Sequence, residues 1–185
     1  MKRILISHWV TAGIVLATAV ILQGMGRATI CECGTIKLFY FQTGTSKGSQ
    51  HLFDWYSPSH VLHGFIFYAA LWLFARRVPM GWQLAIATLV EAAWEIVDNT
   101  DAIINRYREA TIALDYYGDS IVNSRADIAA MFLGFWLFKT LPVWASVLII
   151  IIAEVVVIYA IRDGLALNVL MLLYPVEAVK VWQRG

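Results

Sequence analysis

Charged residues are scarce in this 185-residue sequence, at 15% against about 25% in soluble proteins. Hydrophobic residues make up 60% of the chain, and the mean hydropathy is +0.67. This composition excludes an ordinary soluble domain and predicts a chain embedded in a membrane. The eight tryptophans and eight tyrosines agree with that prediction, because such residues gather where a bilayer meets water.

The sequence also lacks an excess of either charge, with 14 basic against 13 acidic residues. This balance excludes the basic surface of a nucleic-acid-binding protein and gives no sign of a polyanionic partner. Two cysteines, Cys31 and Cys33, are too few for a secreted fold built on disulfides. There is no internal repeat and no low-complexity segment, so we expect a single membrane domain over residues 1–185.

Six apolar segments predict helices near residues 4–22, 59–74, 81–97, 119–138, 143–161 and 165–181. About 20 residues cross a bilayer core, so the first five should span, whereas Pro175 should shorten or bend the sixth. The first run is longer than the core of a signal peptide and no cleavage site follows it, so we expect a retained helix. The predicted fold is an all-α polytopic membrane bundle with five or six transmembrane helices.

Basic residues flank the ends and connections that six crossings would place on one side: Lys2, Arg3, Arg76, Arg77, Lys139, Lys180 and Arg184. The positive-inside rule makes that side cytoplasmic. We therefore predict a multi-pass protein of a bacterial inner membrane, with both termini cytoplasmic and with long outer loops at 24–56 and 99–118.

Local signals place the starts of two helices. Ser57 followed by Pro58 predicts an N-cap for the second helix, and Asp119 after Gly118 predicts one for the fourth. Aromatic residues just ahead of these starts are expected to anchor the chain at the membrane surface: Trp55, Tyr56, Tyr116 and Tyr117.

Polar residues recur at helical spacing within three of the apolar segments. The three stripes are His60 and His63, then Glu91, Glu95 and Asp98, then Asp119, Asn123 and Asp127. Alternating helix directions put all three in the outer half of the membrane. Each charge facing lipid would cost about 2.5–3.5 kcal/mol, so the stripes should face the bundle interior and share protons or a cation.

Imidazoles and carboxylates on neighbouring helices form a donor set suited to zinc, manganese or iron. We expect His60, His63, Glu91 and Asp127 to hold the metal. Glu95 would act as acid or base, Asn123 would donate a hydrogen bond to the substrate, and Asp119 completes the catalytic set. A metal with an open position would activate water for hydrolysis or transfer on a lipid or a lipid-linked ester or phosphoester.

Further charged residues are predicted to contact the substrate: Asp54, Arg106, Arg108, Arg125 and Arg162. Three alternatives stay open at this point. The cavity could bind an ion or lipid without chemistry, the chain could be an accessory subunit of a larger membrane complex, or the stripes could be a structural hydrogen-bond network.

Two other features carry weaker signals. Glu154 lies in an otherwise apolar run, and we expect it to hold two helices together and to be dispensable for the site. Cys31 and Cys33 fall in an outer loop, where a disulfide across one residue would be strained and reducible. Thiolate metal binding is the alternative, and inert thiols or a simple pair are expected.

Several long motifs resemble an uncharacterised bacterial inner-membrane family: CECG, QHLFDWYSPSHVLHGFIFY, EAAWEIVDN, RYREATIALDYYGDSIVNSRADI and IRDGLALNVLMLLYP. The resemblance covers nearly the whole chain and implies a multi-pass membrane protein with no established activity. More distantly, the chain is similar to VanZ-like membrane proteins, whose members affect sensitivity to glycopeptide antibiotics. The residues that would carry this pattern are Asp54, His60, Glu91, Asp119, Asn123 and Gly134. The sequence departs from it by adding His63, Glu95 and Asp127.

Overall fold

Eight helices account for most of the computed structural model, which describes residues 6–111 and 115–184. They are α1 (Ile6–Gly24), α2 (Ser57–Phe74), α3 (Met80–Asp98), α4 (Asp101–Ala110), α5 (Ile121–Thr140), α6 (Val143–Ile161), α7 (Leu165–Leu173) and α8 (Glu177–Arg184). The described ranges contain no strand beyond one isolated bridge between Phe39 and Phe53. The all-α fold class is thus confirmed.

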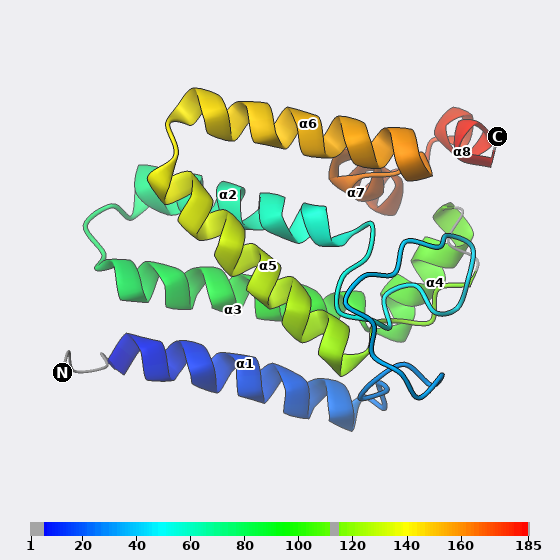
Figure 1. Cartoon of the computed structure of the whole chain (residues 1–185), viewed down its shortest axis with the longest axis horizontal. Helices are drawn as coiled ribbons and strands as arrows, with labels where there is room; N and C mark the ends of the chain where they lie inside the picture. The colour runs from blue at the N-terminus through cyan, green and yellow to red at the C-terminus, as the bar shows by residue number, and fades with distance from the viewer. Residues whose placement is uncertain (1–5, 112–114, 185) are drawn as a thin grey trace.

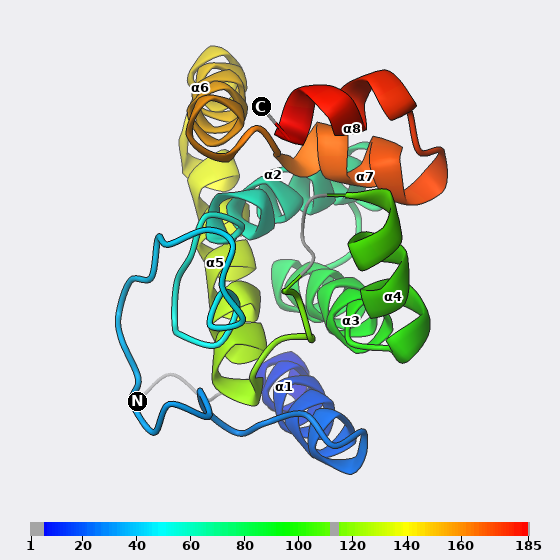
Figure 2. The same cartoon turned by 90° about the vertical axis from the view of Figure 1, so that its right-hand side faces the viewer.

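Five long helices run back and forth along one axis (Figure 1). The short connections at residues 75–79 and 141–142 lie at one end of this bundle, here called the turn end. The connection 25–56 and helices α4, α7 and α8 gather at the opposite end, here called the loop end. Figure 2 looks onto the loop end and shows the 25–56 connection on one side, with α4, α7 and α8 on the other.

Among the described residues, three helices are long and apolar enough to cross a membrane: α1, α5 and α6. This is fewer than the five or six that the apolar segments predict. The α2 and α3 helices have the same length but carry the polar stripes, with three acids in α3 alone. Their side chains lower the average hydropathy without changing the direction in which the helices run.

The α2 and α5 helices cross at two glycines. A Cβ atom on Gly64 would collide with the backbone of Met131, and one on Gly134 would collide with the backbone of Val61. Small residues let helices in a membrane approach this closely. The buried apolar core lies beside the crossing and consists of Ala87, Ile128, Met131 and Phe135.

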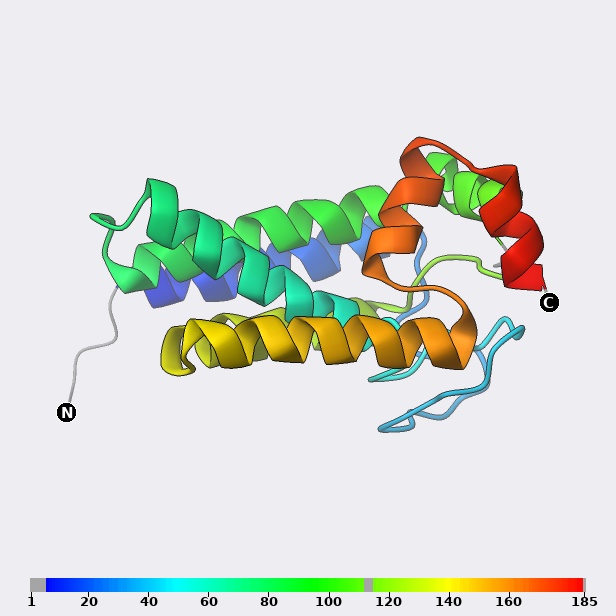
Figure 3. The same ribbon diagram turned by 90° about the horizontal axis from the view of Figure 1, so that it is seen from above.

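The predicted sixth transmembrane helix is wrong, because the segment is broken into α7 and α8 around Pro175. The nine residues of α7 extend roughly 14 Å, about half of a bilayer core. The chain therefore does not return, and α8 lies at the loop end while α1 begins at the turn end (Figure 3). Because α1 starts at one end and α8 lies at the other, the predicted pair of cytoplasmic termini would need a sixth crossing, which the described residues do not contain.

The helix starts differ from prediction by one residue. The N-cap of α5 is Ser120, whose side chain accepts from the backbone N–H of Asn123. Asp119 does not cap the helix because Asn99 and Tyr116 donate to its carboxylate. Ser57 is the first residue of α2 rather than its cap, although Pro58 stands in the first turn as predicted.

The described residues of both predicted outer loops form defined local structure. The predicted outer loop at 99–118 contains α4, which Thr100 caps by accepting from the backbone N–H of Ile103. In the 25–56 connection, Cys31 and Cys33 form a disulfide. The carboxylate of Asp54 accepts from the backbone N–H groups of Ser49 and Tyr56 and so shapes the approach to α2.

Candidate functional site

The three polar stripes of α2, α3 and α5 meet in the loop-end half of the bundle. The Nδ1 atom of His60 lies 2.7 Å from Glu91 Oε1 and 3.4 Å from Glu95 Oε1. The Nδ1 atom of His63 lies 2.9 Å from Glu91 Oε2. On the other edge of its ring, His60 Nε2 lies 3.8 Å from Asp127 Oδ2. The structure thus brings together all four predicted metal ligands and Glu95.

Two overlapping sets of donors have the spacing needed for a metal ion. One is His60, His63 and Glu91, and the other is His60, Glu95 and Asp127, each with its donor atoms within 4.8 Å of one another. Nitrogen and oxygen donors of this kind suit zinc, manganese or iron. Because His60 belongs to both sets, it is the centre of the cluster.

Burial raises the electrostatic cost of the charged groups in the cluster. The exposed fractions of Glu91, Glu95 and Asp127 are 0%, 1% and 4%. Three buried carboxylates face two imidazoles, and Glu95 Oε1 accepts no hydrogen bond from the described residues. Carboxylates in such surroundings need protons or a cation, since burying their charge unpaired is costly.

Helix geometry explains why these side chains converge. His60 and His63 are three residues apart, so they lie on one face of α2, and Glu91 and Glu95 are four apart on α3. The close crossing at Gly64 and Gly134 brings α5 against α2 one turn beyond His60 and directly after His63. The site therefore lies next to this close helix crossing.

A cavity of about 80 Å³ adjoins the cluster. Its lining includes His60, His63, Trp94, Asp98, Tyr107, Tyr116, Asp119, Asn123 and Asp127, with Asp54, Tyr56, Ser49 and Ser59 and with Leu165 and Asn168 of α7. A larger cavity of about 310 Å³ lies at the loop end and shares Asp54, Tyr56 and Tyr116 with it. The two cavities adjoin one another along these residues.

Asp119 occupies a hydrogen-bonded position in the lining of the smaller cavity. Its carboxylate accepts from Asn99 Nδ2 at 3.0 Å and from the Tyr116 hydroxyl at 3.1 Å. Burial, together with the charges of Asp98 and Asp54, raises the pKa of Asp119 to about 7. Asp119 can therefore gain or lose a proton near neutral pH, as a catalytic acid or base requires.

Asn123 and Asp54 also line the cavity while holding the loop above it. The side-chain nitrogen of Asn123 donates to the carbonyl oxygen of Leu52 at 3.4 Å. Asp54 Oδ2 accepts from the Ser49 hydroxyl at 3.0 Å. Both residues are thus in reach of a bound molecule, but their present partners belong to the 25–56 connection.

The four predicted substrate-binding arginines lie away from the smaller cavity. Arg106 Nε donates to the carbonyl oxygen of Leu172, and Arg162 donates to that of Trp182. The guanidinium of Arg108 stacks over the Tyr117 ring at 4.8 Å, and Arg125 is exposed on α5. Among the described residues that line the cavity at the cluster, none is Lys or Arg.

The tyrosines of the cavity wall are the functional residues that sequence reasoning missed. Tyr116 donates to Asp98 and Asp119, Tyr56 donates to Asp163, and Tyr107 donates to Asn168. Burial raises the pKa of Tyr107 and Tyr116, which keeps both hydroxyls as neutral donors. In the sequence, only their position next to the polar stripes indicates these tyrosines. The same position also agrees with the membrane-surface anchors that we expected Tyr56 and Tyr116 to be.

Glu154 lies outside the cavity and holds α7 instead. Its two carboxylate oxygens accept from the backbone N–H groups of Leu165 and Ala166, at 3.0 and 3.1 Å. A carboxylate is stabilising at this end of a helix because the first N–H groups have no partner within the helix. Glu154 therefore positions α7, whose Leu165 and Asn168 close one side of the cavity.

Apolar helices around a buried cluster of histidines and carboxylates define an all-helical protein suited to a membrane. The chain belongs to the family described as "Protein of unknown function (DUF2585)", whose family model matches residues 22–185. A "UPF0314 protein" from Paracoccus denitrificans is 60% identical over 95% of this chain and 91% of its own length. "UPF0314 protein Atu8092" from Agrobacterium fabrum is 51% identical over 95% of this chain and 89% of its own. No solved structure matches the chain significantly.

These findings confirm the predicted membership of an uncharacterised bacterial family. They do not test the more distant likeness to VanZ-like proteins, which stays a prediction. Gly134, one of the residues that would carry that likeness, has a clear structural role at the crossing of α2 and α5.

Proposed function

We propose that this chain is an integral protein of the bacterial inner membrane in which α1, α2, α3, α5 and α6 cross the bilayer. The run of five alternating helices supports five crossings, because α2 and α3 can place their polar faces inside the bundle. In this arrangement the apolar surfaces of α1 and α6 face lipid. The C-terminus then lies on the side opposite the start of α1.

The charge distribution supports a cytoplasmic turn end. Arg76, Arg77 and Lys139 lie there, and no acidic residue occurs at residues 55–90 or 128–153, which contain both connections of this end. Basic residues in short connections favour the cytoplasmic side. The loop end, with the cavity, the disulfide and α8, is therefore assigned to the outer side.

We further propose that the cluster binds a divalent metal. The observation that carries this proposal is the meeting of two imidazoles and three buried carboxylates within a few ångströms. His60, His63, Glu91 and Asp127 would hold the ion, and beside them Glu95 Oε1 accepts no hydrogen bond from any residue that the structure describes. A bound cation would offset the negative charge that the bundle otherwise buries.

Next to such a metal, the chain would act as a hydrolase or transferase on a lipid or lipid-linked substrate. The metal would supply Lewis acidity and an activated water. Glu95 and Asp119 would exchange protons with the reacting groups, and Asn123 would donate to a substrate oxygen. The position of the cavity, in the outer half of the proposed membrane protein, supports a substrate that is itself anchored in lipid.

The lining of the cavity favours an ester over a phosphoester. Phosphate groups are usually recognised by Arg or Lys, and neither lines the cavity. Tyrosine hydroxyls, amides and carboxylates instead suit a neutral group with hydroxyls, which can donate to Asp98 and accept from Asn123. The arginines expected to bind substrate therefore have no role in this proposal.

A second candidate function is ion binding without chemistry. The cavity beside the cluster is small, at about 80 Å³, and this size suits a cation with a few waters better than a lipid headgroup. A role as accessory subunit of a larger membrane complex stays a prediction. Both alternatives retain the buried cluster but require no acid or base.

Metal analysis of the full chain, purified in mild detergent, tests the proposal. We expect a stoichiometric divalent metal in the wild type and its loss in His60→Ala and His63→Ala. His8→Ala is the matched control, because His8 is an exposed histidine of α1 outside the cluster. Thermal unfolding of each variant distinguishes a lost ligand from a lost fold.

Two outcomes would contradict the proposal. One is a folded wild type that contains no metal and binds none when Zn²⁺, Mn²⁺ or Fe²⁺ is added. The other is a His63→Ala variant that keeps its metal but loses stability, which is the behaviour of a purely structural network.

A further inference from the structure

The two cysteines of the disulfide in the 25–56 connection differ in their exposure to solvent. Cys31 is 2% exposed, whereas Cys33 is exposed to solvent. The two residues are separated by Glu32 alone, and the backbone N–H of Cys33 donates to the Cys31 sulfur at 3.2 Å. An attacking thiolate can reach a sulfur only where it is exposed, so Cys33 is the accessible end of the bond.

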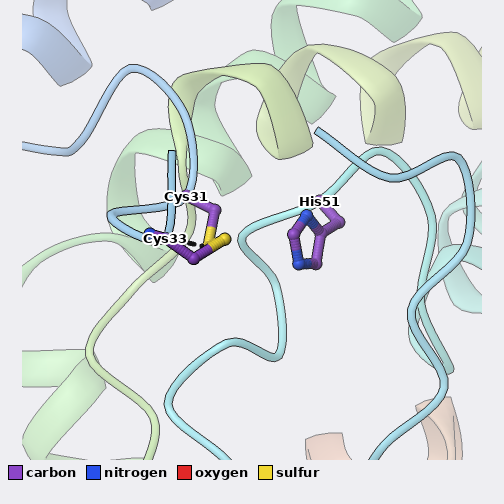
Figure 4. A group of neighbouring side chains, drawn as sticks. All are labelled: Cys31, Cys33 and His51. Carbon is purple, nitrogen blue, oxygen red and sulfur yellow. Dashed lines mark hydrogen bonds between the residues drawn. A yellow bond between two sulfur atoms is a disulfide. The ribbon is translucent and has the colours of Figure 1, made fainter. Parts of the chain in front are cut away.

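His51 lies beside this disulfide, with its ring next to the two sulfur atoms (Figure 4). One ring nitrogen and both sulfurs lie within 4.8 Å of one another. The ring is 1% exposed, and its Nδ1 accepts from the backbone N–H of Lys37 at 3.3 Å. A neutral ring in this position carries its proton on Nε2, which is buried and has no hydrogen-bond partner among the described residues.

The fold fixes the pair and the histidine relative to each other. Three backbone hydrogen bonds tie their two segments to the start of α5: Ile121 N–H to Ala28 O, Val122 N–H to Thr29 O and Ser120 N–H to Ser49 O. Segments about 20 residues apart in sequence are thereby attached to the same helix end. The encounter of His51 with the disulfide is a built feature of the loop end.

We propose that Cys31 and Cys33 form a thiol–disulfide exchange centre that oxidises a dithiol on the outer side of the membrane. The first thiolate of the dithiol attacks the exposed Cys33 sulfur, and the bond between the two cysteines breaks. Its electron pair goes to Cys31, which becomes a buried thiolate. His51, one of whose ring nitrogens lies within 4.8 Å of both sulfurs, then stabilises that thiolate as the leaving group through an N–H hydrogen bond.

The second thiolate of the same dithiol completes the exchange. It attacks the substrate sulfur of the mixed disulfide, and Cys33 leaves as a thiolate that takes up a proton from solvent. The dithiol loses two electrons and two protons and becomes a disulfide, while Cys31 and Cys33 gain the two electrons, each takes up a proton from solvent, and both become thiols. The proposal rests on the orientation proposed above and is independent of any metal at the cluster.

The experiment follows thiol release from the full chain in mild detergent. Dithiothreitol is the dithiol probe, and alkylation with a maleimide reports free cysteines by mass. We expect reduction at millimolar dithiothreitol while the thermal transition of the fold is retained. In His51→Phe, which keeps a ring beside Tyr40 but has no N–H, reduction should be about tenfold slower, because the leaving thiolate loses its charge-assisted hydrogen bond. His8→Gln, at an exposed histidine of α1, should reduce at the wild-type rate.

Single-cysteine variants test the asymmetry of the pair. In Cys31→Ser, oxidised glutathione should form a mixed disulfide with Cys33 in the folded protein. In Cys33→Ser, Cys31 should react only after unfolding. If either variant fails to fold, peptide mapping of the wild type, quenched during reaction with reduced glutathione, identifies which cysteine carries the adduct.

Other results would overturn the proposal. Reduction that requires unfolding would make the disulfide purely structural. Equal reactivity of both cysteines would remove the assigned leaving group. Zinc binding by the reduced chain that depends on His51, without any effect of His51→Phe on exchange, would make the group a metal site instead.

Discussion

The helices α5 and α6 are neighbours in sequence and have almost the same length, yet they are built in opposite ways. In the most apolar part of α5, 56% of residues are buried, against 17% in the corresponding part of α6. The buried face of α5 carries Asn123 and Asp127, while the exposed face of α6 is aliphatic apart from Trp144 and Tyr159 near its two ends. Polar groups inside and apolar groups outside are the arrangement expected in lipid.

The α5 and α6 helices therefore have different roles in the bundle. The α5 helix packs against α2 and α3 and carries polar residues of the cluster, so its mean hydropathy is lower than that of α6. The α6 helix has few buried residues and carries Glu154, which accepts hydrogen bonds from the start of α7. Variants of the two helices should therefore fail for different reasons.

The largest effect is expected at the crossing of α5 with α2. In Gly134→Val the new side chain would collide with the backbone of Val61, and backbone cannot move aside as a flexible side chain can. We expect a loss of about 3 kcal/mol or more in the free energy of unfolding, measured by thermal or denaturant unfolding in detergent. Gly13→Val on α1 is the control, because nothing lies within 4 Å of its added Cβ. Equal stability of the two variants would show that the crossing is looser than described.

A lysine on the exposed face of α6 tests whether that face contacts lipid. Ile151 is 54% exposed and Ile36, in the 25–56 connection, is 51% exposed. Ile151→Lys should cost about 2.5–3.5 kcal/mol for membrane insertion. Ile36→Lys, at nearly equal exposure, should change stability by less than about 0.5 kcal/mol. Membrane insertion and thermal stability measure the difference, and equal tolerance at both positions would contradict the membrane assignment of α6.

The pKa of Asp119 predicts how stability depends on pH at the start of α5. Burial and the charges of Asp98 and Asp54 raise it to about 7, so the folded chain holds this proton more tightly than the unfolded chain. The contribution of Asp119 to stability is therefore fully present below the ordinary pKa near 4 and is lost as pH rises through about 7. In Asp119→Asn the thermal midpoint should vary less between pH 5 and pH 8. An unchanged slope would assign the titration to another group.

The smallest effect is expected at Glu154. Glu154→Gln keeps the size of the side chain but replaces one acceptor with a donor that cannot pair with the backbone N–H of Leu165 or Ala166. We expect a loss of about 1 kcal/mol in unfolding free energy, with metal content unchanged. Glu109→Gln, on the exposed side of α4, is the control. Loss of metal from a stable Glu154→Gln variant would show that the cluster depends on α7.

The convergence of the stripes was predictable because charged groups in apolar helices have few acceptable positions. Glu91 and Asp127 had to face inward, and their matching depth brought both of them to the imidazole of His60. The same reasoning located the start of α2 and the long helices to within a few residues. Periodicity and the cost of burying charge were sufficient for these features.

Other features depend on partners that are remote in sequence. The carboxylate of Glu154 in α6 accepts hydrogen bonds from two backbone N–H groups at the start of α7. These bonds join two helices across the turn between them, and no local sequence pattern indicates them. Arg106 and Arg162 were expected at a substrate but donate to backbone carbonyls of the C-terminal segments. The sequence does not indicate which acceptor the long side chain of an arginine reaches.

The turn end of the bundle has a consequence for assembly. Between the described helices it consists only of residues 75–79 and the two residues 141–142, so it offers little surface to a soluble protein. In the proposed orientation, a cytoplasmic protein that bound these connections would meet only a few basic side chains. A stable partner would have to associate within the bilayer, along faces such as that of α6, or dock at the other end. Searches for binding proteins are thus best made by crosslinking in intact membranes.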